Sequence, residues 1–131
     1  MKKFELAYPG PLRDQLLQAI MDGKKTATST PLSEWKSKEA LPQSGERPTL
    51  VNSDEQEVGV VEITKVEQYK LGEVPWAVAD AEGEDFTDVA DWRRAHEQFW
   101  LAGNYNDSTA NWQLSDDMMI VVEWFKLLKK S

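Results

Sequence analysis

Two segments rich in β-branched residues constrain the fold of this chain most strongly. The first segment, residues 57–68, holds Val58, Val60, Val61, Ile63 and Val66. The second is the apolar run Met118 to Phe125. Such side chains favour strands, and the adjacent valines indicate a strand covered on both faces, as in a barrel. Residues 49–52 predict a short strand before it, and residues 53–56 predict the connecting turn. The C-terminal run is expected to close the sheet.

Two helical patterns flank these strands. Leucine and isoleucine recur at helical spacing in a segment that Pro11 starts and Gly23 caps, which predicts a helix from about Pro11 to Asp22. A second helix begins after Asp88 and ends before Gly103; its buried face is formed by Val89, Trp92, His96 and Phe99. Helices and a small curled sheet predict an α+β fold.

Composition fits one domain, residues 1–131, in a reducing compartment. The chain has 131 residues and no cysteine, which excludes disulfides and thiolate zinc sites and favours the cytoplasm. Neither a signal peptide nor a membrane span is expected. The formal net charge of -8 argues against broad binding to nucleic acid phosphates, so double-stranded DNA is not an expected partner.

The charge is unevenly distributed along the chain. Lysine and arginine outnumber acids between residues 24 and 47, whereas residues 73–91 hold acids and no lysine or arginine. A basic and an acidic segment can form the two walls of one site. They can equally be separate solvated surfaces, and charge alone leaves both readings open.

The sequence Gly-Lys-Lys-Thr-Ala-Thr at residues 23–28 follows the first predicted helix. It places two ammonium groups and two hydroxyls at the start of a segment expected to be exposed. The cluster can hold an anion, or it can supply a nucleophile and its activator. A lysine with a lowered pKa, Lys25, can take the proton of Thr28 three positions later. The alternative is a solvated loop.

Glu82-Gly83-Glu84 precedes the second helix. The glycine lets the backbone turn, so that the two carboxylates project differently. A carboxylate there can fix a lysine, orient a substrate amine or carry a proton. The alternative is an ordinary acidic turn.

The remaining candidates are aromatic or weakly supported. His96 lies on the apolar helix face and is expected to be packed and hydrogen bonded rather than catalytic. A single histidine without cysteine supports no metal site. Trp35 lies beside Lys36 in residues 31–48, a long ordered loop or flap. Its ring can stack on a base while the lysine contacts phosphate, or it can anchor the loop.

Three of these motifs together resemble the ASCH domain family, over nearly the whole chain. They are residues 23–28, residues 82–85 (Glu-Gly-Glu-Asp), and Trp92-Arg93 with His96. The resemblance implies a small β-barrel related to the PUA fold, with flanking helices and a cleft between barrel and helices. PUA-like domains commonly bind RNA, and some family members are reported as single-strand ribonucleases. Some small bacterial members are amidohydrolases that remove acyl groups from N4-acylated cytidine.

The resemblance also implies roles for individual residues. Lys25, Thr28 and Glu84 match the catalytic positions of the amidohydrolases. Substrate contacts are expected from Lys24, Thr26, Trp35, Lys36 and Glu82, and no cofactor or metal is expected. The expected function is hydrolysis of an N4-acylated cytidine or a related nucleoside. The alternatives are a single-stranded RNA-binding module or ribonuclease, and a non-catalytic domain that binds a nucleoside or an anion.

Overall fold

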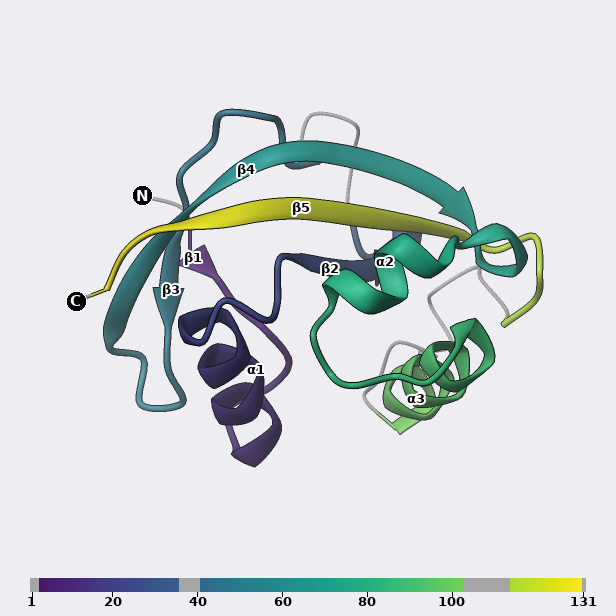
Figure 1. Ribbon diagram of the computed structural model, residues 1–131, viewed down its shortest axis with the longest axis horizontal. Coiled ribbons are helices and arrows are strands. Elements are labelled where there is room, and N and C mark those ends of the chain that lie inside the picture. The colour runs from purple at the N-terminus through teal and green to yellow at the C-terminus, as the bar shows by residue number, and fades with distance from the viewer. Residues whose placement is uncertain (1–2, 36–40, 103–113, 131) are drawn as a thin grey trace.

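The computed structural model describes residues 3–35, 41–102 and 114–130 (Figure 1). The helices and strands are, in chain order, β1 (Lys3–Phe4), α1 (Pro11–Met21), β2 (Ala27–Pro31), β3 (Thr49–Val51), β4 (Glu57–Lys70), α2 (Trp76–Ala81), α3 (Val89–Ala102) and β5 (Met119–Lys130). Short 3-10 turns, η1 (Leu32–Glu34) and η3 (Leu71–Glu73), follow β2 and β4. The predicted helices and the predicted strands at 49–52, 57–68 and 118–125 are confirmed.

The five strands form one mixed sheet in the order β1-β3-β4-β5-β2. β1 pairs with β3 in parallel, and the other pairs are antiparallel. β4 and β5 form a long ribbon that arches over the three helices, with α1 under one half and α2 and α3 under the other (Figure 1). The sequence prediction ended both strands too early, because charged residues follow their apolar parts.

The predicted closed barrel is not confirmed. Within the described part of the chain, β1 and β2 are the two edges of the sheet and do not pair with each other. Residues of both edges, Phe4 and Thr28 among them, instead line a cavity. The two edge strands are therefore not joined by backbone hydrogen bonds, and the cavity is lined by side chains from both of them.

Two apolar clusters hold the helices against the sheet. One joins α2 and α3 to β2 and β5, through Ala27, Val78, Ala79, Trp92, Trp100, Ile120 and Val122. The other joins α1 to β1, β3, β4 and β5, through Phe4, Leu17, Ile20, Leu50, Val61, Ile63 and Phe125. The cavity lies where residues from the two halves face each other.

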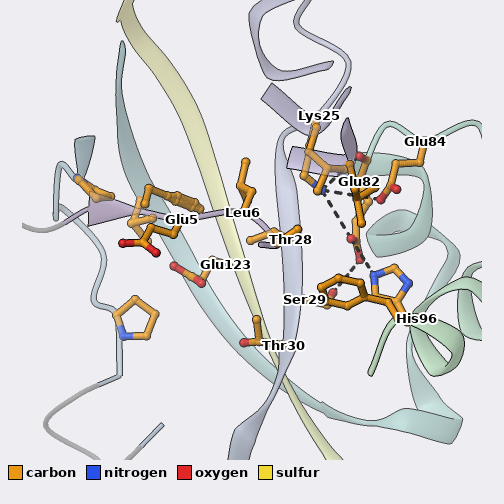
Figure 2. Close-up of a pocket in the computed structure, with 18 of the residues that line it drawn as sticks. Glu5, Leu6, Lys25, Thr28, Ser29, Thr30, Glu82, Glu84, His96 and Glu123 are labelled. Atoms are coloured by element: carbon orange, nitrogen blue, oxygen red, sulfur yellow. Dashed lines mark hydrogen bonds and ion pairs between the residues drawn. The ribbon is translucent and has the colours of Figure 1, made fainter. Parts of the chain in front are cut away.

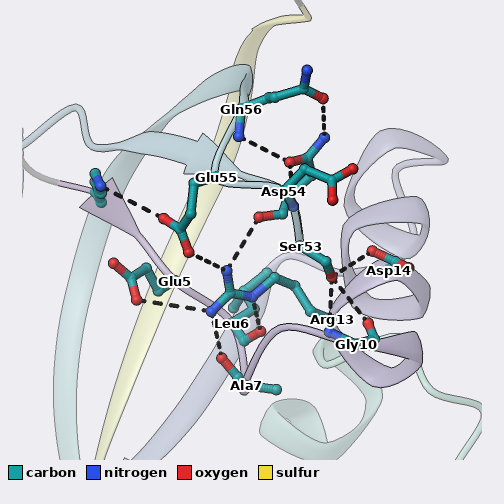
Figure 3. A network of polar contacts seen from close by, with 12 residues as sticks. Glu5, Leu6, Ala7, Gly10, Arg13, Asp14, Ser53, Asp54, Glu55 and Gln56 are labelled. Atoms are coloured by element: carbon teal, nitrogen blue, oxygen red, sulfur yellow. Dashed lines mark hydrogen bonds and ion pairs between the residues drawn. The ribbon is translucent and has the colours of Figure 1, made fainter.

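A buried arginine fixes α1 to the rest of the fold (Figure 3). The guanidinium of Arg13 donates to the carbonyl oxygens of Leu6 (3.1 Å), Ala7 (2.8 Å) and Asn52 (3.2 Å). Arg13 is 1% exposed, so its donors must be satisfied by the protein. The network ties the segment after β1 to the turn between β3 and β4.

Three elements were not predicted: β1, β2 and α2. β2 is the important one, because the sequence interpretation placed its residues in an exposed loop. Its Thr and Ser residues show no apolar periodicity, yet it pairs along its whole length with the apolar strand β5. Pairing with a distant strand thus decides its conformation.

Two predicted loops fall partly outside the described residues. Residues 36–40 of the expected flap at 31–48, including Lys36, and residues 104–113 of the loop at 104–115 are not described. Among the helices that the structure describes, none is long and apolar enough to cross a lipid bilayer.

Candidate active site

A cavity of about 470 Å³ opens between the two halves of the molecule. Lys25, Thr28, Glu82, Glu84 and His96 all line it (Figure 2). Small-ligand sites typically measure about 300–1,000 Å³. The cavity is therefore large enough for a molecule of nucleoside size.

Lys25 is buried, which corrects the expectation of an exposed cluster. After α1, Gly23 adopts a φ of 78°, and the amide of Lys25 still bonds to the carbonyl of Ala19 at 3.1 Å. Lys25 is 2% exposed, whereas Lys24 faces solvent. The turn after α1 thus divides the two ammonium groups between interior and surface.

Four acceptors surround the Lys25 ammonium. It donates to the carbonyl oxygens of Ala27 at 2.9 Å and Glu82 at 3.3 Å. Its Nζ also lies 3.6 Å from the carboxylate of Glu82 and 3.9 Å from that of Glu84. Because all four neighbours are acceptors, the amine is held as a three-proton ammonium.

Gly83 places the two carboxylates around this ammonium. It has a φ of 70°, and a Cβ on it would lie 2.4 Å from the carbonyl oxygen of Lys24. The amide of Thr26 also donates to the carbonyl of Ala81 at 2.7 Å. The turn after α2 therefore packs directly on the backbone that carries Lys25, with Glu82 and Glu84 on either side of Gly83.

Glu82 is the centre of the polar network. Its Oε1 accepts a hydrogen bond from His96 at 3.0 Å, and its Oε2 accepts from Ser29 at 2.8 Å and from the indole of Trp92. Burial by itself would raise the pKa of Glu82, but the charges of His96 and Lys25 and these hydrogen bonds lower it to about 2. Glu82 is therefore ionised at neutral pH, and both of its carboxylate oxygens accept hydrogen bonds.

His96 adds a second positive charge beside Glu82, on a side chain that is 11% exposed. Its Nδ1 lies 2.8 Å from the carbonyl oxygen of Trp92 and its Nε2 faces Glu82, so both ring nitrogens donate to acceptors. Burial would lower the pKa of His96, but the Glu82 charge and the two hydrogen bonds raise it above the ordinary value of 6.5. The ring also stacks on Trp92, with centroids 4.5 Å apart.

Glu84 differs from Glu82 in its exposure and in the direction of its pKa shift. Its side chain is 28% exposed. Burial raises the pKa of Glu84 above its ordinary value and the Glu82 charge adds to this, while Lys25 and His96 oppose it. Glu84 is thus the carboxyl group of the cluster that is suited to carrying a proton.

Thr28 lines the same cavity from β2, without contacting Lys25 directly. It is half-buried, and among the described residues no hydrogen bond joins its hydroxyl to the Lys25 ammonium. β2 is an edge strand, so the cavity reaches side chains on both of its faces. The structure therefore brings Lys25, Thr28 and Glu84 to one cavity, with Lys25 and Glu84 in contact.

A family model described as ASCH domain matches residues 5–129. The chain belongs to the ASCH domain family. A search of curated proteins finds no match.

Three crystal structures share the fold of this ASCH domain. A protein from Enterococcus faecalis V583 is 23% identical, with a TM-score of 0.85, over 99% of this chain and 77% of its own. An ASCH domain from Lactobacillus crispatus JV V101 is 24% identical, with a TM-score of 0.81, over 96% and 78%. A mutant ASCH protein from Zymomonas mobilis is 11% identical, with a TM-score of 0.53, over 90% and 69%. At these identities the likeness concerns the fold.

The predicted substrate-binding residues lie in different places in the ASCH domain. Lys24 and Thr26 are exposed and do not line the cavity. Trp35 lines it, half-buried, and its indole donates to Thr30 at 3.2 Å. Glu82 lines the cavity and is buried, and Lys36 lies outside the described residues.

Glu123 is a cavity-lining residue that the sequence interpretation missed. It stands on β5 directly opposite Thr28 and is 9% exposed. The signal was present, because Glu123 is the one charged residue in the apolar run Met118 to Phe125.

The polar cluster of the ASCH domain also contains three potential metal ligands. One atom each from Glu82, Glu84 and His96 lies within 4.8 Å of the others. However, both nitrogens of His96 donate hydrogen bonds, and the Lys25 ammonium is already an ion-pair partner of both glutamates. These residues therefore do not fit a metal ion as they stand.

Proposed function

We propose that this ASCH domain hydrolyses the amide bond of an N4-acylated cytidine or a related nucleoside. The observation that carries the proposal is the meeting of Lys25, Thr28 and Glu84 in one cavity, with Nζ of Lys25 3.9 Å from Glu84. These are the positions to which the family resemblance assigns catalysis. The cavity volume of about 470 Å³ also suits a ligand of this size.

The walls of the cavity match the parts of such a substrate. Apolar side chains, among them Leu12, Leu16 and Phe99, offer a surface for an acyl group or the face of a base, and Trp35 offers an indole. The polar cluster, which also lines the cavity, offers charged groups for the amide. In the proposed pose, the ligand lies along the edge strand β2 with its carbonyl carbon at Thr28 and its amide nitrogen toward Glu84.

In the proposed reaction, the Thr28 hydroxyl oxygen attacks the carbonyl carbon of the amide. The Lys25 ammonium activates Thr28 electrostatically, because a fixed positive charge stabilises the negative charge that develops on oxygen. Glu84, in its protonated form, gives its proton to the nitrogen of the leaving amine. Water then hydrolyses the acyl ester on Thr28 and releases the acid.

The cavity's charges favour a small uncharged substrate over RNA. Among the described residues, five carboxylates line it, against two lysines and one histidine, so phosphate groups would meet an acidic surface there. RNA binding, ribonuclease action and non-catalytic nucleoside binding stay as predictions. A protein that binds RNA would show affinity that falls steeply with salt, without releasing any acid.

The test is release of cytidine from N4-acetylcytidine by the purified protein and by Lys25→Ala and Lys25→Met. We expect hydrolysis by the wild type and a loss of about 100-fold or more in both variants, since a lost electrostatic stabiliser typically costs this much. The control is Glu57→Gln, on an exposed residue of β4 that does not line the cavity. Equal rates in wild type and in folded Lys25→Met would refute the role of Lys25.

A further inference from the structure

The proposed reaction needs an acceptor for the proton of Thr28. Lys25 is already an ammonium with four acceptors around it, so it has no free electron pair for a proton. Glu82 is ionised but fully occupied by His96, Ser29 and Trp92. Among the described residues on the Lys25 side of β2, Lys25 and Glu82 are thus occupied, and Glu84 already has the role of acid in the proposed reaction.

Glu123 is placed where such a base must be. In the register of β2 and β5, Thr28 lies directly opposite Glu123. Directly opposed residues of antiparallel strands project from the same face, with Cβ atoms roughly 4.5–5.5 Å apart. This separation is within the reach of a glutamate side chain toward a threonine hydroxyl.

Successive side chains of β2 point to opposite faces of the strand, which divides the cavity-lining residues into two groups. Ser29 points to one face and bonds to Glu82, so its neighbour Thr28 points to the other face, where Glu123 lies. Figure 2 shows this division, with Lys25, Glu82, Glu84 and His96 on one side of β2 and Glu123 on the other. Both groups line the same cavity.

Glu123 is largely buried and still lines the cavity. It stands between Val122 and Trp124 in β5 and is 9% exposed. Glu5 and Glu46 line the cavity as well, so this wall carries several carboxylates. What distinguishes Glu123 among them is its register opposite Thr28.

We propose that Glu123 is the general base that deprotonates Thr28. This inference rests on the proposed amidohydrolase function. In acylation, the Thr28 proton passes to the Glu123 carboxylate while the Thr28 oxygen bonds to the acyl carbon. The bond from that carbon to the amide nitrogen breaks, and protonated Glu84 supplies the proton of the leaving amine.

Deacylation returns both groups to their starting state. Water gives one proton to the Glu84 carboxylate while its oxygen bonds to the acyl carbon of the ester. The Thr28 oxygen leaves and recovers its proton from Glu123. One amide and one water are consumed, and one amine and one carboxylic acid are released.

The first test replaces the carboxylate by its amide in Glu123→Gln, with Glu57→Gln as the matched strand control. A general base typically contributes about 10²–10⁴-fold, so we expect kcat to fall by that factor in Glu123→Gln and to stay unchanged in the control. Cytidine, the product, should still raise the melting temperature of Glu123→Gln, because binding does not need the base. An active wild type and an equally active Glu123→Gln would overturn this inference alone.

The second test separates chemistry from folding within one preparation. Glu123→Ala is assayed with and without formate, a small carboxylate that fits the space left by the side chain. We expect formate to restore part of the lost rate in Glu123→Ala and to leave Thr28→Val inactive. A structural role for Glu123 predicts no rescue and would overturn the inference. An inactive wild type would overturn both this inference and the proposed function.

Discussion

The Nζ of Lys25 lies 3.6 Å from Oε1 of Glu82, and each side chain keeps at most 2% of its surface exposed. The pair joins the end of α1 to the end of α2, two segments far apart in the sequence. His96 adds a second positive partner at 3.0 Å from the same oxygen. Fold and site therefore depend on one buried carboxylate.

Removing the Glu82 charge should destabilise the protein strongly. In Glu82→Gln, the Lys25 ammonium and the His96 imidazolium lose their common counter-charge inside the protein. Breaking a buried pair in this way costs about 3–5 kcal/mol. Urea unfolding should show this loss, whereas Glu57→Gln should stay within about 0.5 kcal/mol of wild type, as exposed substitutions do. A Glu82→Gln protein as stable as the control would contradict the ionised network.

The same carboxylate predicts the acid sensitivity of the fold. The pKa of Glu82 in the folded state is about 2, below its ordinary value of 4.5, so the folded state binds fewer protons there. This contribution, on the order of 3 kcal/mol, is fully present above pH 4.5 and is lost as the pH falls toward 2. The stability difference between wild type and Glu82→Gln should shrink over this range. A difference that does not change with pH would argue against it.

Gly83 should be much less replaceable than Gly23. Both have positive φ angles, 70° and 78°, but a Cβ on Gly83 meets the Lys24 carbonyl whereas a Cβ on Gly23 has nothing within 4 Å. Gly23→Ala should cost about 1–2 kcal/mol for the backbone conformation. Gly83→Ala adds an overpacking cost of about 1–3 kcal/mol. Thermal unfolding of the two variants, side by side, measures the difference; equal losses would show that the turn does not pack as described.

Glu84 should set the alkaline limit of activity. Its raised pKa keeps a fraction of the carboxyl protonated above pH 4.5, and only this form gives a proton to the amine. The value of kcat/KM should therefore fall as the pH rises through the pKa of Glu84. In Glu84→Gln the rate should drop by about 10²–10⁴-fold and lose this limb. If the fall in kcat/KM at high pH were unchanged in Glu84→Gln, that fall would belong to another titrating group.

The sequence predicted the main strands and helices because their apolar patterns are local. The β-branched segment at 57–68 and the helical spacing from Leu12 to Ile20 are visible without tertiary contacts. β2 is different, since Ala27–Pro31 owes its strand conformation to pairing with β5. The open sheet likewise depends on the cavity between its edges, which no local pattern reports.

The site was predictable in its residue types and only partly in its geometry. The spacing around Gly83 indicated two carboxylates with different environments, and the structure has one buried and one partly exposed. The contact of Glu82 with His96 depends on how α3 packs after the turn, and the position of Thr28 opposite Glu123 depends on strand register. Both are tertiary properties, so sequence patterns alone do not reveal them.

The central claim is that Thr28 attacks an acylated nucleoside in this cavity. The most direct measurement is the rate of cytidine release from N4-acetylcytidine by wild type and by Thr28→Val, which keeps the shape of the side chain but removes the hydroxyl. The account predicts turnover by the wild type and no release above the uncatalysed rate by Thr28→Val, with both proteins equally folded. Equal rates for the two proteins, or no turnover by the wild type, would contradict it.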